Sequence, residues 1–160
     1  MAELGELPFS MRLFLKAYPW RRIDPTPWTP LKKCLAQCRL ALVSSAGFVL
    51  PTQKRFDETT KGGDPSFREI PNDAEVSTLV ESHRSHAFDH SGIHQDPNLA
   101  FPIDRARELV DCGRIGSLNR RHLSFMGSIT APGRFMRHHV PQAANWLTED
   151  GVDVALLVPV

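Results

Sequence analysis

The chain ends on its most apolar stretch, DGVDVALLVPV at residues 150–160. Chain termini are usually polar and frayed unless packing holds them in place. An apolar run of strand length that follows an Asp-Gly pair is instead typical of a buried β-strand. We therefore expect residues 153–160 to form a core strand, and the sheet that contains this strand to be incomplete at the C-terminus.

Other apolar runs of strand length alternate with helical patterns along the chain. The expected elements are strands at 39–43, 67–70, 122–129 and 153–160, and helices at 105–112 and 133–149. Asp104 is expected to cap the first helix and Gly113 to close it, whereas Pro141 should kink or restart the second. Strands and helices in this order predict an α/β fold with a mainly parallel sheet and flanking helices.

The first part of the chain differs in composition from the rest. We interpret residues 1–30 as an N-terminal aromatic and proline-rich arm, and residues 31–160 as the α/β domain. Four prolines and several aromatic residues occur between residues 14 and 30. This composition favours an extended segment that lies on a surface through its aromatic rings. A short amphipathic helix at 11–18 is the alternative for its first half.

Composition argues against several classes of protein. The net charge of +1 gives no electrostatic reason to expect nucleic acid or an anionic membrane as a partner. No apolar stretch reaches the ~20 residues that a membrane-spanning helix needs. Glu3 and Glu6 come before any apolar segment, which is not the pattern of a signal peptide. Three cysteines, an odd number, fit no disulfide framework. We therefore expect a cytoplasmic protein.

Four of the seven histidines crowd into the stretch SHRSHAFDHSGIH at 82–94, which is expected to be mostly loop. These are His83, His86, His90 and His94. One interpretation is a loop for substrate binding or proton transfer, and another is a set of solvated surface histidines. A metal site with Asp89 is a third, but Gly92 and Pro97 disfavour the helix that would align its ligands, and neither HExxH nor CxxC is present.

Two turns rich in glycine and serine follow the expected strands, SSAG at 44–47 and MGSITAPG at 126–133. The second opens a helix, where free backbone N–H groups can hold a carboxylate or phosphate. An ordinary connection from strand to helix explains the same letters. The chain contains no GxGxxG, GxxxxGK[ST] or GxSxG motif, so neither nucleotide binding nor α/β-hydrolase chemistry is favoured. We find no convincing nucleophile and predict no cofactor.

Taken together, several stretches resemble a known family. FPIDRARELVDCGRIGSLNRRHLSFMGS at 101–128 and LTEDGVDVALLVPV at 147–160 resemble the B subunits of the glycine, sarcosine, betaine and D-proline reductases, and most of all their shorter stand-alone bacterial relatives. The likeness runs from about Arg39 to Val160 and includes ALVSSAG, GGDPSFREIP and SHAFDHSG. It implies that residues 31–160 are a reductase B-subunit-like α/β domain.

The resemblance also offers a reason for the apolar terminus. In this family the strand that matches 153–160 leads into a motif that begins with selenocysteine or cysteine. Because UGA encodes selenocysteine and is otherwise a stop, we expect the selenocysteine immediately after Val160 and regard the chain as a truncated, inactive selenoprotein fragment. The implied reaction is reductive C–N bond cleavage in an amino acid or betaine. The implied partners are a thiol redox protein and a further subunit.

Site residues are assigned by analogy with the family. His86, His90 and Asp89 are the expected catalytic residues, with one histidine as proton donor or as the cation that stabilises a selenolate. The expected substrate-binding residues are Ser44, Ser45, Gly47, Gly127 and Ser128. Two alternatives remain open. One is a metal-dependent enzyme that uses His86, His90 and His94. The other is a non-catalytic binding module that docks through the aromatic arm.

Overall fold

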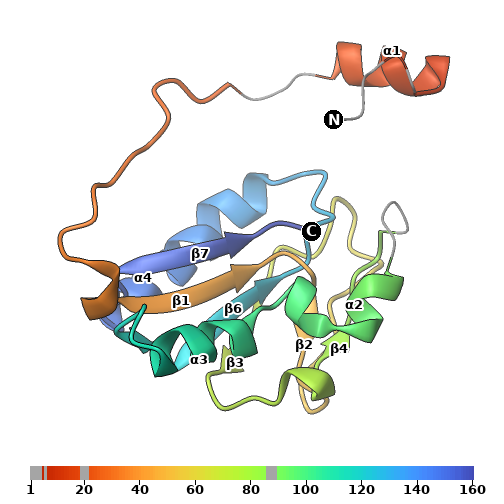
Figure 1. Cartoon of the computed structure of the whole chain (residues 1–160). Coiled ribbons are helices and arrows are strands. Elements are labelled where there is room, and N and C mark those ends of the chain that lie inside the picture. The colour runs from red at the N-terminus through yellow and green to blue at the C-terminus, as the bar shows by residue number, and fades with distance from the viewer. Residues whose placement is uncertain (1–4, 6, 19–21, 86–89) are drawn as a thin grey trace. The chain divides into compact units, whose positions relative to one another are not determined.

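The computed structural model describes residue 5 and residues 7–18, 22–85 and 90–160 (Figure 1). The chain divides into two compact units, Met1–Pro30 and Leu31–Val160. The first unit contains helix α1 (Phe9–Ala17), in which no side chain is buried. The short helix that the sequence offered as an alternative is therefore present, and residues 22–30 that follow it form neither helix nor strand.

The second unit is built on a mixed sheet whose central strand is β1 (Arg39–Ser44). Its other strands are β3 (Phe67–Pro71), β5 (Ser117–Leu118), β6 (Arg121–Phe125) and β7 (Val154–Val158). Strand β1 pairs in parallel with β5, β6 and β7, whereas β3 runs antiparallel to β6. The predicted α/β fold with a mainly parallel sheet is confirmed, with β3 as the exception. A separate antiparallel pair joins β2 (Phe48–Val49) to β4 (Val80–Glu81).

Helices cover both faces of the sheet, as Figure 1 shows. They are α2 (Ser91–Gln95), α3 (Ile103–Asp111) and α4 (Val140–Glu149), with a π-helical turn at Phe135–His139 directly before α4. Pro141 lies in the first turn of α4, where its missing N–H leaves no hydrogen bond unmade. The helical segment is thus irregular in the π turn, and α4 starts after it with Pro141 in its first turn.

The core follows from the alternation of side chains along the strands. Leu40 and Leu42 of β1 point to one face, where they pack with Phe101 and Ile103 at the start of α3. Leu123 and Phe125 of β6 point to the other face and pack against α4 and the π turn. Two hydrophobic layers therefore enclose the sheet, and they fix the positions at which its strands end.

Three expectations about individual elements were wrong. Strand β7 is not a core strand, because among the described residues it pairs with β1 alone, and Leu156 and Leu157 are 43% and 67% exposed. Asp104 does not cap α3 but lies in its first turn, where its backbone N–H donates to Asn98 Oδ1 at 3.1 Å. The histidine-rich loop contains α2, a single turn that buries Ile93 despite Gly92.

Candidate functional site

The carboxyl ends of three parallel strands meet around a cavity of about 370 Å³. Its walls come from residues 43–45 at the end of β1, from residues 125–127 at the end of β6, and from residues 157–159 at the end of β7. Ile129, Pro132 and Phe135 close it on the side of α4. The carboxyl edge of a parallel sheet is where α/β proteins generally bind ligands, and most of this lining is apolar.

Backbone hydrogen bonds tie the three strand ends together. Ser45 N–H donates to Val158 O at 3.1 Å, and Gly127 N–H donates to Ser45 O at 2.8 Å. The Ser45 hydroxyl accepts from Val160 N–H at 2.9 Å. A Cβ at Gly127 would lie 3.0 Å from Ser45 O, so this close approach favours glycine. The structure thus brings two predicted residues, Ser45 and Gly127, together at the end of β7.

The other three predicted binding residues have different surroundings. Ser44 is buried, and its hydroxyl donates to Ala100 O at 2.6 Å and accepts from Ala46 N–H at 3.1 Å. Gly47 has φ +72°, and a Cβ there would lie 2.9 Å from Ser82 O. The Ser128 hydroxyl accepts from Arg84 Nε at 3.3 Å. Ser44 therefore supports the fold, whereas Gly47 and Ser128 contact the start of the histidine loop.

Glu81, the last residue of β4, holds two imidazole rings of the histidine loop. His90 Nδ1 lies 2.6 Å from one carboxylate oxygen of Glu81, and His94 Nε2 lies 2.9 Å from the other. The second nitrogen of His90 lies 2.8 Å from Ser85 O. Both nitrogens of His90 thus lie within hydrogen-bond distance of oxygen atoms, which fixes the orientation of the ring. In the same loop, burial lowers the pKa of His83.

The other predicted catalytic residues, His86 and Asp89, lie outside the described residues. Across residues 7–18, 22–85 and 90–160, no three His, Cys, Asp or Glu side chains are grouped as metal ligands. The metal-dependent alternative named His86, His90 and His94, so one member of its ligand set falls in the undescribed stretch. For the same described ranges, no helix is long and apolar enough to span a bilayer.

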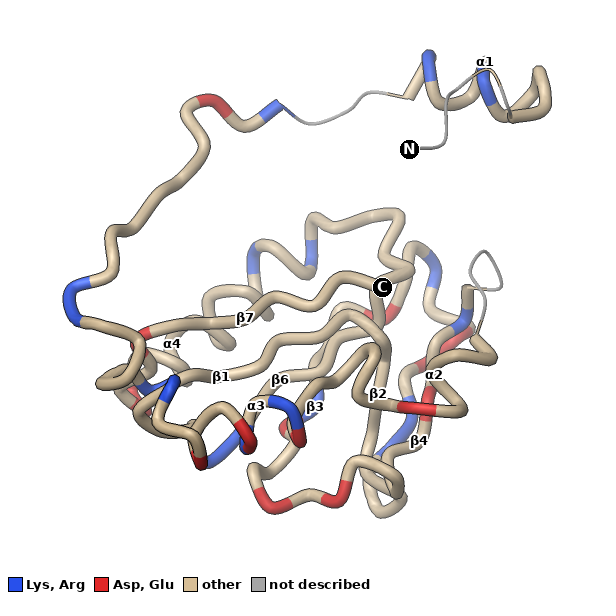
Figure 2. Tube along the Cα trace, in the orientation of Figure 1, with Lys and Arg blue, Asp and Glu red and all other residues tan. Residues whose placement is uncertain are grey.

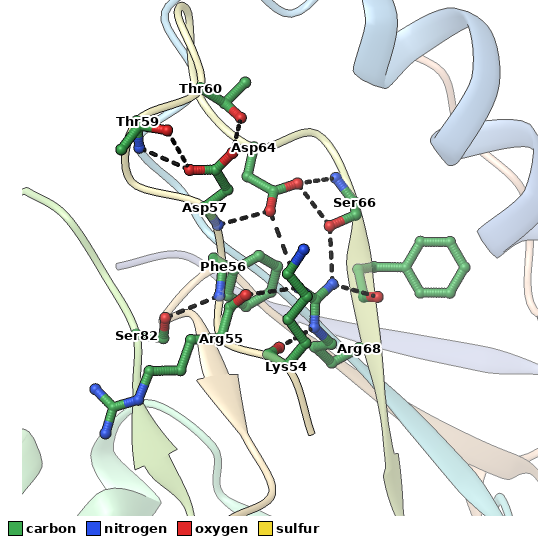
Figure 3. A network of polar contacts seen from close by, with 11 residues as sticks. Lys54, Arg55, Phe56, Asp57, Thr59, Thr60, Asp64, Ser66, Arg68 and Ser82 are labelled. Atoms are coloured by element: carbon green, nitrogen blue, oxygen red, sulfur yellow. Dashed lines mark hydrogen bonds and ion pairs between the residues drawn. The ribbon is translucent and has the colours of Figure 1, made fainter. Parts of the chain in front are cut away.

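A polar network orders the loop that leads into β3 (Figure 3). Asp64 accepts from Asp57 N–H at 2.8 Å and from the Ser66 hydroxyl at 2.6 Å. Arg68 donates through Nη1 to Ser66 Oγ at 2.8 Å and through Nε to Lys54 O at 2.8 Å. Hydrogen bonds from Thr59 and Thr60 lower the pKa of Asp57 to about 2, so this carboxyl group is ionised.

Two glycines of this ordered loop lie against the loop that follows β6. Gly62 and Gly63 have φ of +85° and +97°, in the region that glycine adopts without strain. A Cβ on Gly63 would lie 2.6 Å from Ser128 O, and Ala131 N–H donates to Gly62 O at 3.1 Å. Residues 60–63 therefore hold the 127–132 loop that forms one wall of the cavity.

Sequence reasoning missed two residues of this region, Glu81 and Arg84. Glu81 pairs with His90 and His94 from a different element, so no local spacing marks it. Arg84 lies between His83 and Ser85 in the histidine-rich stretch. Its guanidinium group was the available signal, because arginine recognises carboxylates and phosphates through paired hydrogen bonds.

Comparison with known proteins identifies the class of protein that this fold and site belong to. The model of the family "Glycine/sarcosine/betaine reductase selenoprotein B (GRDB)" matches residues 9–159. The chain belongs to this family, as its resemblance predicted.

Among curated relatives, the chain is 39% identical over 136 residues to D-proline reductase subunit gamma of Acetoanaerobium sticklandii, covering 84% of this chain and 54% of that protein. It is 26% identical over 144 residues to sarcosine reductase complex component B subunit beta of Peptoclostridium acidaminophilum, covering 90% and 33%. For glycine reductase complex component B subunit gamma of Carboxydothermus hydrogenoformans the identity is 27% over 147 residues, again covering 90% and 33%. The chain thus spans about half or less of these relatives, and no solved structure matches it.

Proposed function

We propose that the chain forms the scaffold of a substrate site in a reductase of the glycine, sarcosine, betaine and D-proline type. Its relatives are named as subunits of such reductases or of their complexes. The observation that carries the proposal is the cavity at the ends of β1, β6 and β7. Pro159 lines this cavity and Val160 is hydrogen-bonded to Ser45. A residue joined to Val160 would therefore lie beside the cavity.

In this proposal the residue joined to Val160 in the complete gene product is the expected selenocysteine or cysteine. A selenol ionises below neutral pH, whereas a thiol has a reference pKa near 8.5, so the selenolate is the readier nucleophile. Reductive cleavage converts one C–N bond into a C–H and an N–H bond. It consumes two electrons and two protons, while a dithiol partner is oxidised to a disulfide.

The chain's own residues have defined parts in this scheme. Ser45 and Gly127 fix the end of β7, and thereby the position of the incoming selenol or thiol. His90 is held in the adjacent loop by Glu81. A thiol redox protein, a further subunit of a complex and a cytoplasmic location belong to the same proposal. The binding-module alternative, with Tyr18, Trp20 and Trp28 as its contact residues, also stays a prediction. Tyr18 and Trp28 are exposed, and Trp20 lies outside the described residues.

The first test is the coding sequence beyond the codon for Val160. We expect an in-frame UGA or cysteine codon followed by further cysteine codons. The second is turnover by the complete gene product with its partner proteins, followed as oxidation of dithiothreitol in the presence of D-proline, glycine, sarcosine or betaine. Alanine in place of the selenocysteine or cysteine should abolish turnover. An ordinary terminator after Val160, or turnover that survives this replacement, would refute the redox assignment.

A further inference from the structure

Two arginine side chains from separate parts of the sequence donate hydrogen bonds to one turn, which also contains Lys61. Arg84 donates through Nη1 to Thr60 O at 3.2 Å, and Arg134 donates through Nη2 to the next carbonyl, Lys61 O, also at 3.2 Å. Lys61 itself is exposed. The two guanidinium groups come from the histidine loop and from the segment before the π turn. The fold, rather than local sequence, therefore brings these charges together.

Arg84 and Arg134 are hydrogen-bonded at this turn, but no carboxylate of the described residues neutralises their charge. Among the described residues, Arg84 and Arg134 donate to two carbonyls and the Ser128 hydroxyl, all of them neutral. Within the described part of the chain, no carboxylate forms an ion pair with Lys61, Arg84 or Arg134. Like charges held in one place repel each other, and a bound anion would remove this repulsion.

Three carboxylates lie within residues 57–64, and two of them, Asp57 and Asp64, are directed elsewhere, as Figure 3 shows. The third, Glu58, is exposed and forms no ion pair with a described residue. Asp57 accepts from the hydroxyls of Thr59 and Thr60 at 2.6 and 2.8 Å, and Asp64 lies 3.9 Å from Arg68. Residues 126–148, which follow β6 and include most of α4, contain Arg134 and Arg137 but no Asp or Glu (Figure 2). Neither neighbouring segment therefore supplies a counter-charge.

Arg84 is the best-positioned of the three cations. It is half-buried, and Ser128 Oγ and Thr60 O hold its Nε and Nη1. Its Nη2 donates to no described residue. A guanidinium fixed on one edge can present its remaining donors to both oxygens of a carboxylate. Because these two contacts already order the side chain, binding costs less conformational entropy.

This turn adjoins the cavity through the 127–132 loop. Ser128 binds Arg84, while Gly127, Ile129 and Pro132 of the same loop line the cavity. The backbone N–H of Gly127, the expected carboxylate ligand, is already donated to Ser45 O. We infer that Arg84, with Arg134 and Lys61 beside it, binds the carboxylate of a small amino acid or betaine. This inference rests on the proposed function and adds the residue that recognises the substrate.

The test measures binding to the 160-residue chain by isothermal titration calorimetry. Glycine betaine carries the carboxylate, and choline has the same quaternary ammonium group with an alcohol in its place. We expect the wild type to bind glycine betaine and not choline. Arg84→Gln should weaken binding at least tenfold, as expected for a lost hydrogen-bonded charge pair. Arg134→Gln, at the exposed edge of the site, should weaken it two- to threefold.

Arg114→Gln is the matched control, because Arg114 is exposed, forms no ion pair with a described residue and lies outside this turn. Circular dichroism of each variant checks that the fold is retained, and Arg84→Lys, which keeps the charge, is the second variant if Arg84→Gln does not fold. Unchanged affinity of the Arg84 variant that folds would overturn the inference. Equal loss in Arg114→Gln, equal binding of choline, or no saturable binding of glycine betaine, sarcosine, D-proline or glycine would do the same.

Measurements of ligand binding and of reductase turnover distinguish the carboxylate site at Arg84 from the proposed function. Carboxylate binding that depends on Arg84, together with no reductase turnover by the complete gene product, would leave this site in place and remove the proposed function. Reductase turnover with the same KM in wild type and Arg84→Gln would support the proposed function and remove Arg84 as its substrate ligand.

Discussion

At the scale of single residues, His122 shows how a polar side chain is fixed inside the sheet. It is fully buried in β6. Its Nδ1 accepts from Leu42 N–H at 3.0 Å, so its Nε2 carries the proton and donates to Asn72 Oδ1 at 3.2 Å. Burial, and to a lesser extent the nearby Arg107, lower the pKa of His122 to about 4. The folded protein therefore contains this ring in its neutral form.

A pH dependence of stability follows from this histidine. In the unfolded chain its pKa is near 6.5, so below that pH the unfolded state binds more protons than the folded state. The stabilisation is complete above pH 6.5 and is lost as the pH falls towards 4, by up to about 3 kcal/mol. Urea unfolding at pH 7.5, 6 and 5 measures this loss.

The control for this measurement is the exposed His138. His138→Gln should show the same fall in unfolding free energy with pH as the wild type. His122→Gln should be less stable at pH 7.5 but should lose less on acidification, because its buried side chain no longer titrates. Identical pH profiles for His122→Gln and the wild type would refute the assignment.

Single-residue roles were the part of the molecule that sequence reasoning predicted least. The sequence placed His122 in a strand and Ser44 at a strand end, but it could not show which atoms their side chains contact. Arg84 was passed over because its partners, Thr60 and Ser128, lie 24 and 44 residues away. Contacts of this length depend on how the loops pack, and no local pattern encodes them.

At the scale of elements, the sequence was a better guide. It predicted the strands that became β1, β3, β6 and β7 and the helices that became α3 and α4, because compact apolar runs and glycines mark these elements. It did not predict the antiparallel direction of β3 or the edge position of β7. Those properties depend on pairing between distant segments. The sequence of β7 does not show whether a second strand pairs with its other edge.

Two serines at the ends of β1 and β6 provide a test of how these strands are stabilised. Ser44 and Ser124 are register partners and both are buried. The Ser44 hydroxyl makes two hydrogen bonds, whereas the Ser124 hydroxyl has no partner among the described residues. Ser44→Ala should lower the free energy of unfolding by about 1–3 kcal/mol, because it leaves Ala46 N–H and Ala100 O unsatisfied.

Ser124→Ala is the matched variant and should leave stability unchanged or raise it by about 1 kcal/mol, since it removes a buried polar atom that has no partner. Chemical denaturation of both variants at one pH makes the comparison. Equal destabilisation by the two substitutions would show that the hydrogen bonds of Ser44 are not the reason for its effect.

At the scale of the whole molecule, the two units differ in what they bury. Among the described residues, every buried apolar side chain lies at Cys38 or later in the sequence. In the first unit Phe9, Leu13 and Trp28 are exposed. The family was recognisable from sequence because its short motifs occur in order from Arg39 to Val160, which needs no knowledge of contacts. The arrangement of loops around the cavity was not recognisable in this way.

Deletion of residues 1–30 tests the proposed division into an arm and a domain. Since residues 31–160 contain all the buried apolar side chains of the described chain, we expect the shortened protein to unfold cooperatively within about 2 °C of the full chain, as ~0.5 kcal/mol or less would be lost. Differential scanning calorimetry measures both midpoints. A midpoint lower by 10 °C, or a loss of cooperativity, would show that the arm is part of the domain.

The pairing of β1 also determines when this protein can fold on the ribosome. Strand β1 is the central strand of the sheet, yet the strands that pair with it, β5, β6 and β7, all follow late in the chain. Leu42 and its hydrogen-bond partner His122 are 80 residues apart. At typical rates of translation this interval is roughly 4 to 16 seconds. During that time a nascent strand of Leu, Ala and Val has no sheet to join, which makes this segment the natural target for a chaperone that binds emerging chains.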